Sequence, residues 1–203
     1  MSYILTPIAV DLGRIASLIG SGDDRLVGVL VEEFGHRIKR IDKMAADHAE
    51  DIEAEAATTV RDALAQMVNG ERYDEEVGFV YGYALEFVCE HLGECLPNEG
   101  WSGIRAEWAE MADEALGSVG VDEAALRLGS LMYRGSPVPL PAIDDFPFIG
   151  YLRGPEIKAA LEAFDEERLT RVGDDEMRSS LAELRGWLRR CEASGRDLIC
   201  FYA

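Results

Sequence analysis

The residues of this sequence with the clearest potential for chemistry are two glutamates, Glu86 and Glu90, in an apolar stretch over 73–93. Together with Gly78 and Gly82 they recur at every fourth position, so a helix places all four on one face. A carboxylate held in a groove above two glycines would lose solvation. Its pKa would then rise into a range that suits acid/base catalysis.

The same four residues on one helix face have a structural interpretation, which we favour. Glycines at 78 and 82 permit a neighbouring helix to cross closely, and the two glutamates then reach solvent or an arginine. Structural ion pairs shift the pKa of a carboxylate as readily as a catalytic site does. These four residues therefore predict no catalytic residue. Glu86 remains a ligand-binding candidate, with Tyr81 or Tyr83 nearby and Tyr83 as the preferred partner.

A second set of polar candidates lies in loops. Asp144 and Asp145 follow a proline-rich run in the segment 137–155, which is too apolar for a disordered linker and is expected to wrap the core as an ordered loop. Arg196 stands just before the last apolar run of the chain. All three are ligand-binding candidates, although adjacent aspartates also serve as ordinary turn formers.

Metal-type residues cluster only at Cys89, His91 and Cys95. Zinc takes about four ligands in a tetrahedral array, and no second group of Cys or His completes such a set. We therefore expect no metal and no cofactor, and we interpret all four cysteines as free thiols, mostly buried. The isolated His36 and His48 are interpreted as solvated surface residues.

The elements that position these candidates predict a helix-rich α+β fold. The runs at the two ends of the chain, 3–10 and 197–202, are β-branched and apolar and are expected to pair in a small sheet. Pro7 places the first strand at an edge or marks a break in it. Helical spacing is expected over 12–19, 24–31, 41–69, 74–92, 101–116, 122–132, 155–164 and 177–191, with a short strand at 148–152. The helix over 41–69 is either continuous or interrupted near Ala45.

Length and composition favour one compact domain over residues 1–203. The chain has 203 residues, of which 48% are hydrophobic, enough for one sizeable core. The N-terminus has no signal-peptide pattern, and no apolar run approaches the length of a membrane span, so we expect a cytoplasmic protein.

Charge is the strongest constraint on partners. The formal net charge is -19, from 20 Lys and Arg against 39 Asp and Glu. This field would repel phosphates, which disfavours binding to nucleic acid or to an anionic membrane. A basic protein or a cationic ligand would fit it, although the same charge also suits a protein that is merely soluble.

The chain resembles the uncharacterised bacterial proteins of the YfbM-like kind. The resemblance rests on four segments and does not extend to the acidic run 41–69 or to the tryptophan run at 101. The four segments are YILTPIAVDLGRIASLIGSGDDRL, YDEEVGFVYGYALEFVCEHLGE, PLPAIDDFPFIGYL and GRDLICFYA. It implies an α+β fold with paired termini and no established activity, so no catalytic residue is carried over.

These observations favour a non-enzymatic, acidic protein-interaction domain of immunity-like or regulatory type, with a basic protein as the expected partner. The alternative is a small-ligand-binding protein or enzyme with a pocket beside the loop 137–155. Its ligand-binding candidates would be Tyr83, Glu86, Asp144, Asp145 and Arg196. The sequence leaves the oligomeric state open.

Overall fold

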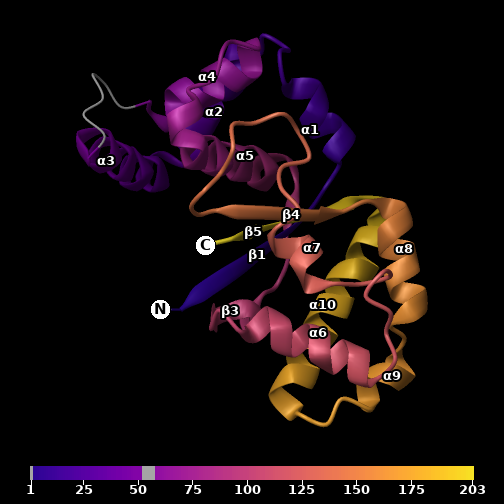
Figure 1. Cartoon of the computed structure of the whole chain (residues 1–203). Coiled ribbons are helices and arrows are strands. Elements are labelled where there is room, and N and C mark those ends of the chain that lie inside the picture. The colour runs from indigo at the N-terminus through magenta and orange to yellow at the C-terminus, as the bar shows by residue number, and fades with distance from the viewer. Residues whose placement is uncertain (1, 52–57) are drawn as a thin grey trace. The chain divides into compact units, whose positions relative to one another are not determined.

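The computed structural model describes residues 2–51 and 58–203, and they divide into two compact units. Unit 1 comprises Met1–Asp11, Gly93–Gly135 and Phe148–Ala203, and unit 2 comprises Leu12–Leu92 and Ser136–Pro147. Figure 1 draws their elements. The expectation that the whole chain forms one domain stays a prediction, and each unit is described by itself.

Unit 1 is built on an antiparallel sheet that joins the two ends of the chain (Figure 1). The strand order is β2-β1-β5-β4, and β3 also pairs with β1. The strands are β1 Tyr3–Val10, β2 Glu94–Cys95, β3 Ser102–Ile104, β4 Phe148–Leu152 and β5 Asp197–Tyr202. The register between β1 and β5 runs from Leu5 opposite Tyr202 to Val10 opposite Asp197. The predicted α+β class and the pairing of the terminal strands are confirmed.

The expectation that Pro7 puts β1 at an edge or breaks it is wrong, because β1 runs unbroken from Tyr3 to Val10 and Pro7 stands opposite Cys200 of β5. The strand is internal, with β5 on one side and the short strands β2 and β3 on the other. On that second side, β3 pairs with Tyr3 and Ile4, and β2 pairs with Ile8 and Ala9. Pro7 falls between the two, and this position tolerates a residue without an amide hydrogen.

The helices of unit 1 include one long helix, α10, whose inner face is buried. Its Trp187 meets Trp101 with ring centroids 5.6 Å apart, and the Trp101 indole N–H donates to the Ser180 carbonyl at 2.9 Å. The helices are η2 Glu99–Trp101, α6 Trp108–Ser118, α7 Leu128–Met132, α8 Gly154–Ala163, α9 Glu166–Thr170 and α10 Asp175–Ser194.

Two helices predicted in unit 1 are wrong at their N-terminal ends. The run from Trp101 is not helical, because Ser102 enters β3 and Gly103 has a φ of 75°, a left-handed conformation outside the helical range. The run from Asp122 instead begins with a turn. In this turn the Asp122 carboxylate accepts a hydrogen bond from the amide of Ala124 at 2.8 Å. Such aspartate-capped turns compete with helix formation.

Strand β4 lies at the edge of the sheet order and is held by α7 and the residues that follow it. The Gly135 amide donates to Ile149 O at 2.8 Å, and Arg134 Nη1 donates to Tyr151 O at 3.0 Å. These bonds occupy main-chain acceptors on the strand, which protects an edge from pairing with another chain.

Unit 2 is helical, with α5 at its centre. Most of the circumference of α5 is buried, as its apolar sequence predicts. The helices are α1 Leu12–Leu18, α2 Asp24–Glu33, α3 Gly35–Asp51, α4 Val60–Asn69, η1 Glu75–Val77 and α5 Gly78–Leu92. The segment 136–147 completes the unit as a loop.

The predicted acidic helix over 41–69 is wrong both as one continuous element and as one interrupted near Ala45, which lies inside α3. Helix α3 begins earlier, at Gly35, and α4 begins anew at Val60. Thr59 has an extended backbone and forms a capping box with Asp62, which starts a new helix. The predicted apolar positions Ile52 and Ala56 lie outside the described residues.

Candidate functional site

A partly buried polar cluster of unit 2 joins α3 to α5. Arg37 Nη2 donates to Glu86 Oε1 at 2.9 Å, and Arg37 Nη1 donates to both carboxylate oxygens of Glu90 at 2.7 and 2.6 Å. The two glutamates are four residues apart, so one guanidinium reaches both from the neighbouring helix. We name Arg37, Glu86 and Glu90 the Arg37 cluster.

Aromatic rings position the arginine of this cluster. Phe34 and Phe87 stack with centroids 4.8 Å apart, and Arg37 Cζ lies 4.7 Å from the centroid of Phe87. The guanidinium therefore contacts an aromatic face while its N–H groups point to carboxylates. Its side chain is 40% exposed, against 7% for Glu86, so the cation remains partly hydrated and the carboxylate does not.

Burial dominates the electrostatics of Glu86. It raises the pKa of the Glu86 carboxyl to about 7, against an opposing contribution from Arg37 and with a further rise from Glu90. Burial alone would lower the pKa of Arg37, but its hydrogen bond with Glu90 and the two carboxylate charges raise it above the ordinary value. The cation thus stays charged, while Glu86 is poised to titrate near neutral pH.

The two glycines of α5 permit a close approach, as expected, but the approaching element is the proline-rich loop and not a helix. A Cβ placed on Gly78 would lie 1.9 Å from the Ala142 carbonyl oxygen. One placed on Gly82 would lie 3.1 Å from atoms of Ile143 and Pro147. The segment 136–147 therefore seats directly on the backbone of α5.

Three of the five predicted ligand-binding candidates lie in one neighbourhood of unit 2. Burial raises the pKa of the Tyr83 hydroxyl, and the charges of Glu86 and Asp145 raise it further, while Arg40 and Arg37 oppose them. Tyr83 is thus within electrostatic reach of both carboxylates. The hydrogen bond that Glu86 accepts comes from Arg37 Nη2, at 2.9 Å.

The two loop aspartates are exposed, at a turn of the proline-rich loop. Asp145 Oδ1 accepts the amide of Phe146 at 2.7 Å, which is the behaviour of a turn-forming aspartate.

Arg196, the fifth candidate, belongs to unit 1. Its Nη1 lies 3.7 Å from Glu94 Oε2, and Arg190 Nη2 lies 2.9 Å from the other oxygen of the same carboxylate. Arg196 therefore takes part in an ion pair beside the start of β5.

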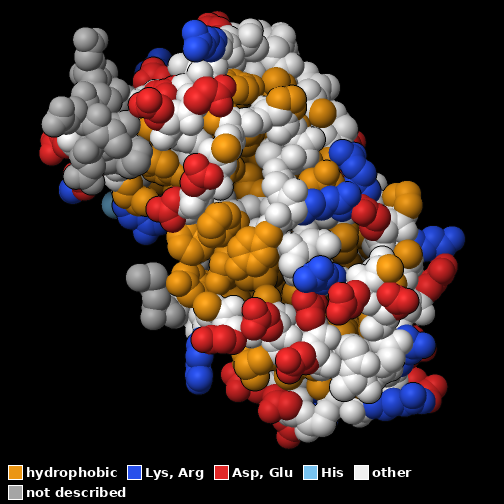
Figure 2. Space-filling view, viewed as in Figure 1, with side chains coloured by type: hydrophobic (Ala, Val, Ile, Leu, Met, Phe, Trp, Pro, Cys, Tyr) orange, Lys and Arg blue, Asp and Glu red, His pale blue; other side chains and the backbone are white. Residues whose placement is uncertain are grey.

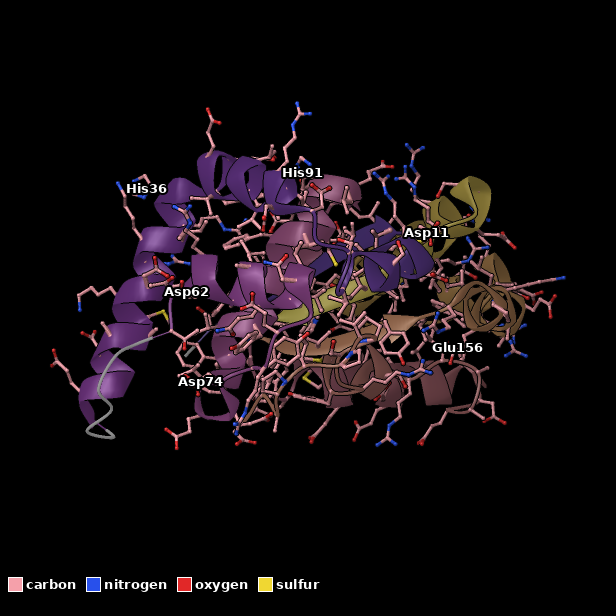
Figure 3. The ribbon with its side chains drawn as sticks, turned by 90° about the horizontal axis from the view of Figure 1, so that it is seen from above. Asp11, His36, Asp62, Asp74, His91 and Glu156 are labelled. Atoms are coloured by element: carbon pink, nitrogen blue, oxygen red, sulfur yellow. The ribbon has the colours of Figure 1, made fainter. Side chains whose placement is uncertain are left out.

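The candidate metal ligands do not gather into a metal site in the described part of the chain. Among residues 2–51 and 58–203, no three His, Cys, Asp or Glu side chains are grouped so that they could hold a metal ion. His91 Nδ1 lies 2.6 Å from Glu33 Oε2 at the end of α5, and His36 is exposed on α3 (Figure 3). Cys89 is buried and Cys95 is exposed.

Sequence reasoning missed Arg37, because it lies 49 residues before Glu86 and nothing in its local pattern marks it as a partner. It also missed two hollows in unit 1, which have no motif. One, of about 440 Å³, lies between β3, α6 and α10 and includes Arg105, Trp108 and Glu176. The other, of about 370 Å³, lies along α10 and includes Leu96 and Trp187.

Residues 1–203 match the protein-family model described as Domain of unknown function (DUF7691). The chain belongs to the DUF7691 family. No curated protein and no solved structure matches it. No helix in the described part of this DUF7691 chain is long and apolar enough to cross a membrane. The family description assigns no activity to the Arg37 cluster or to any other residue.

Proposed function

We propose that this DUF7691 domain is a non-enzymatic interaction domain that binds a basic protein, in the manner of immunity or regulatory proteins. The observation that carries this proposal is a large surplus of carboxylates, giving a net charge of -19. A basic partner would be attracted by that field and would encounter the domain faster than a neutral one.

The ion pairs of the structure support this proposal, because they engage many of the basic side chains with carboxylates of the same chain. At least nine of the 20 Lys and Arg side chains lie within ion-pair distance of a carboxylate. Both units carry a surplus of acid, with 19 Asp and Glu against 8 Lys and Arg in unit 2, and 20 against 12 in unit 1.

A small-ligand or enzymatic site beside the loop 137–155 is the alternative. Its support is the neighbourhood of Tyr83, Glu86 and Asp145 and the pKa of about 7 for Glu86. Arg37 already occupies the Glu86 carboxylate, so a ligand would have to displace the guanidinium. That cost makes the interaction domain the better-supported function.

The test of the proposed function is capture of partners at two ionic strengths. The immobilised full chain is exposed to a lysate of its source organism at about 0.05 M and about 0.5 M salt, since screening lengths differ severalfold between the two. We expect a defined basic protein that is retained at low salt and released at high salt. The absence of any partner, or a partner whose retention ignores salt, would contradict the proposal.

We infer further that the chain is a cytoplasmic bacterial protein related to the YfbM-like kind. The support is the set of four sequence segments that carry the resemblance. Fractionation of the source cells, with the domain detected by antibody, tests the compartment. Recovery in a membrane or extracellular fraction would contradict it.

A further inference from the structure

Four aromatic side chains of unit 1 meet at one end of its sheet. Tyr133, just after α7, lies edge-on to Phe148 and to Tyr202, with centroids 5.5 and 5.8 Å away. Tyr3 contacts Tyr202 at 5.2 Å. We name Tyr3, Tyr133, Phe148 and Tyr202 the aromatic corner. It is formed by the start of β1, the start of β4, the end of β5 and the end of α7.

The aromatic corner is open to solvent through Tyr133. Tyr133 is 55% exposed, whereas Tyr202 is buried. Figure 2 shows hydrophobic side chains gathered near the C-terminal end of the chain. Exposed aromatic surface of this kind is enriched at interfaces, where a rigid ring loses little entropy on binding.

Carboxylates lie beside the aromatic corner. Ile104 of β3 stands opposite Tyr3 in the sheet, and Glu107 follows three residues later as the residue that caps α6. An acid therefore comes directly after the strand that pairs with the aromatic corner. The charge of Glu107 also adds to the rise that burial causes in the pKa of Tyr202. From Glu107 the exposed positions Met111 and Glu114 follow at helical spacing along α6. Red side chains border the orange surface in Figure 2.

In the described residues of each unit, an arginine is held between an aromatic ring and a carboxylate. In unit 2, Arg37 contacts the Phe87 ring and pairs with two glutamates. In unit 1, Arg134 Cζ lies 4.1 Å from the Tyr151 centroid, and its Nη1 lies 2.8 Å from Glu156 Oε1. An aromatic face beside a carboxylate suits a guanidinium, because it is planar, weakly hydrated and always charged.

We propose that the aromatic corner, together with Glu107 and the exposed acidic face of α6, is the docking surface for an arginine-bearing segment of a basic partner protein. The inference rests on the proposed function and names the surface that carries it. A guanidinium would stack on the exposed ring of Tyr133 and pair with Glu107, and the net charge of the domain would attract the rest of the segment.

The test uses a fluorescein-labelled (Arg-Gly)4 peptide as probe, with (Gln-Gly)4 as the neutral control, in titrations of the full chain at low salt. Tyr133→Ala and Glu107→Gln are the test variants. Met44→Ala, which truncates an exposed apolar residue of unit 2, and Glu192→Gln, which removes an exposed charge of unit 1, are the matched controls. Thermal unfolding checks that each variant is folded. If Tyr133→Ala does not fold, Glu107→Gln still tests the proposal.

We expect each test variant to weaken binding of the arginine peptide about two- to fivefold, the size of an exposed cation–π contact, and each control to leave it unchanged. Equal weakening by Glu107→Gln and Glu192→Gln, or no effect of either test variant, would overturn the docking surface and leave the proposed function standing. Equal binding of the (Gln-Gly)4 peptide would overturn the choice of an arginine-bearing partner. No binding of the arginine peptide even at low salt would contradict the proposed function as well.

Discussion

Arg37 on α3 donates from Nη2 to Glu86 Oε1 on α5 at 2.9 Å, and with this bond a buried carboxylate of unit 2 acquires its cation. The same guanidinium also binds Glu90. Helix α5, which is apolar on most of its circumference, thus carries two acids on one face, and a single arginine of the neighbouring helix pairs with both. The stability of unit 2 should therefore depend on Arg37.

Replacing Arg37 by alanine should destabilise unit 2 by roughly 1–3 kcal/mol, because it leaves Glu86 buried without its charged donor. The guanidinium is partly exposed, so the loss should be smaller than for a fully buried pair. Chemical denaturation followed by circular dichroism measures it. Arg40→Ala, an exposed arginine of the same helix, is the matched control and should change stability by less than about 0.5 kcal/mol. Equal losses for both variants would show that the Arg37 cluster contributes little.

The stability of unit 2 should fall as pH rises from about 4.5 to about 7. The ordinary pKa of Glu86 is 4.5 and its folded value is about 7, so the native state binds more protons than the unfolded state in this window. The stabilisation is complete below the lower value and is lost through the upper one. Denaturation midpoints across this range measure the slope.

Glu86→Gln should remove this contribution and flatten the pH profile, because glutamine does not titrate. Glu71→Gln, at an exposed position of unit 2, should leave the slope in place. A wild-type profile that rises over the window, or one that Glu86→Gln leaves unchanged, would mean that Arg37 keeps the carboxylate ionised throughout.

Gly78→Ala should destabilise the chain by about 1–3 kcal/mol, the usual cost of overpacking. The added Cβ would lie 1.9 Å from the Ala142 carbonyl oxygen, so the loop must move away from α5. Gly28→Ala is the matched control, because its Cβ meets nothing within 4 Å inside α2 and should stabilise that helix by about 0.5–1 kcal/mol. The thermal unfolding midpoints of the two variants should thus shift in opposite directions. Midpoints that shift in the same direction would contradict the close packing of the loop on α5.

The glycines also show how far the sequence alone reaches. Their spacing with Glu86 correctly predicts a helix face on which backbones come close. The spacing cannot distinguish a crossing helix from a loop, because either one can make the same close contact with the glycines. The loop also lies more than 50 residues further along the chain than the glycines. The terminal strands were predictable because each is a local apolar run, and β4 and β5 match their predicted ranges.

Long-range partners were not predictable in the same way. Arg37 carries no local signal, since a charged residue on an exposed-looking helix is the ordinary pattern. The aromatic corner is assembled from four elements whose residues are separately unremarkable in the sequence. The helix predicted over 41–69 failed because Thr59 caps a new helix, a signal present in the sequence that the apolar periodicity outweighed.

Thiol labelling should separate Cys95 from the other three cysteines. Cys89, Cys191 and Cys200 are buried, and burial raises the pKa of each thiol, to about 12 for Cys191, which suppresses the reactive thiolate. Cys95 is exposed on the short strand β2. Iodoacetamide at pH 8 should therefore modify about one thiol per native chain and all of them in denaturant, as mass spectrometry of intact protein would show. Cys95→Ser should abolish the native labelling, and rapid labelling of that variant would reveal that a buried thiol is accessible through opening of its unit.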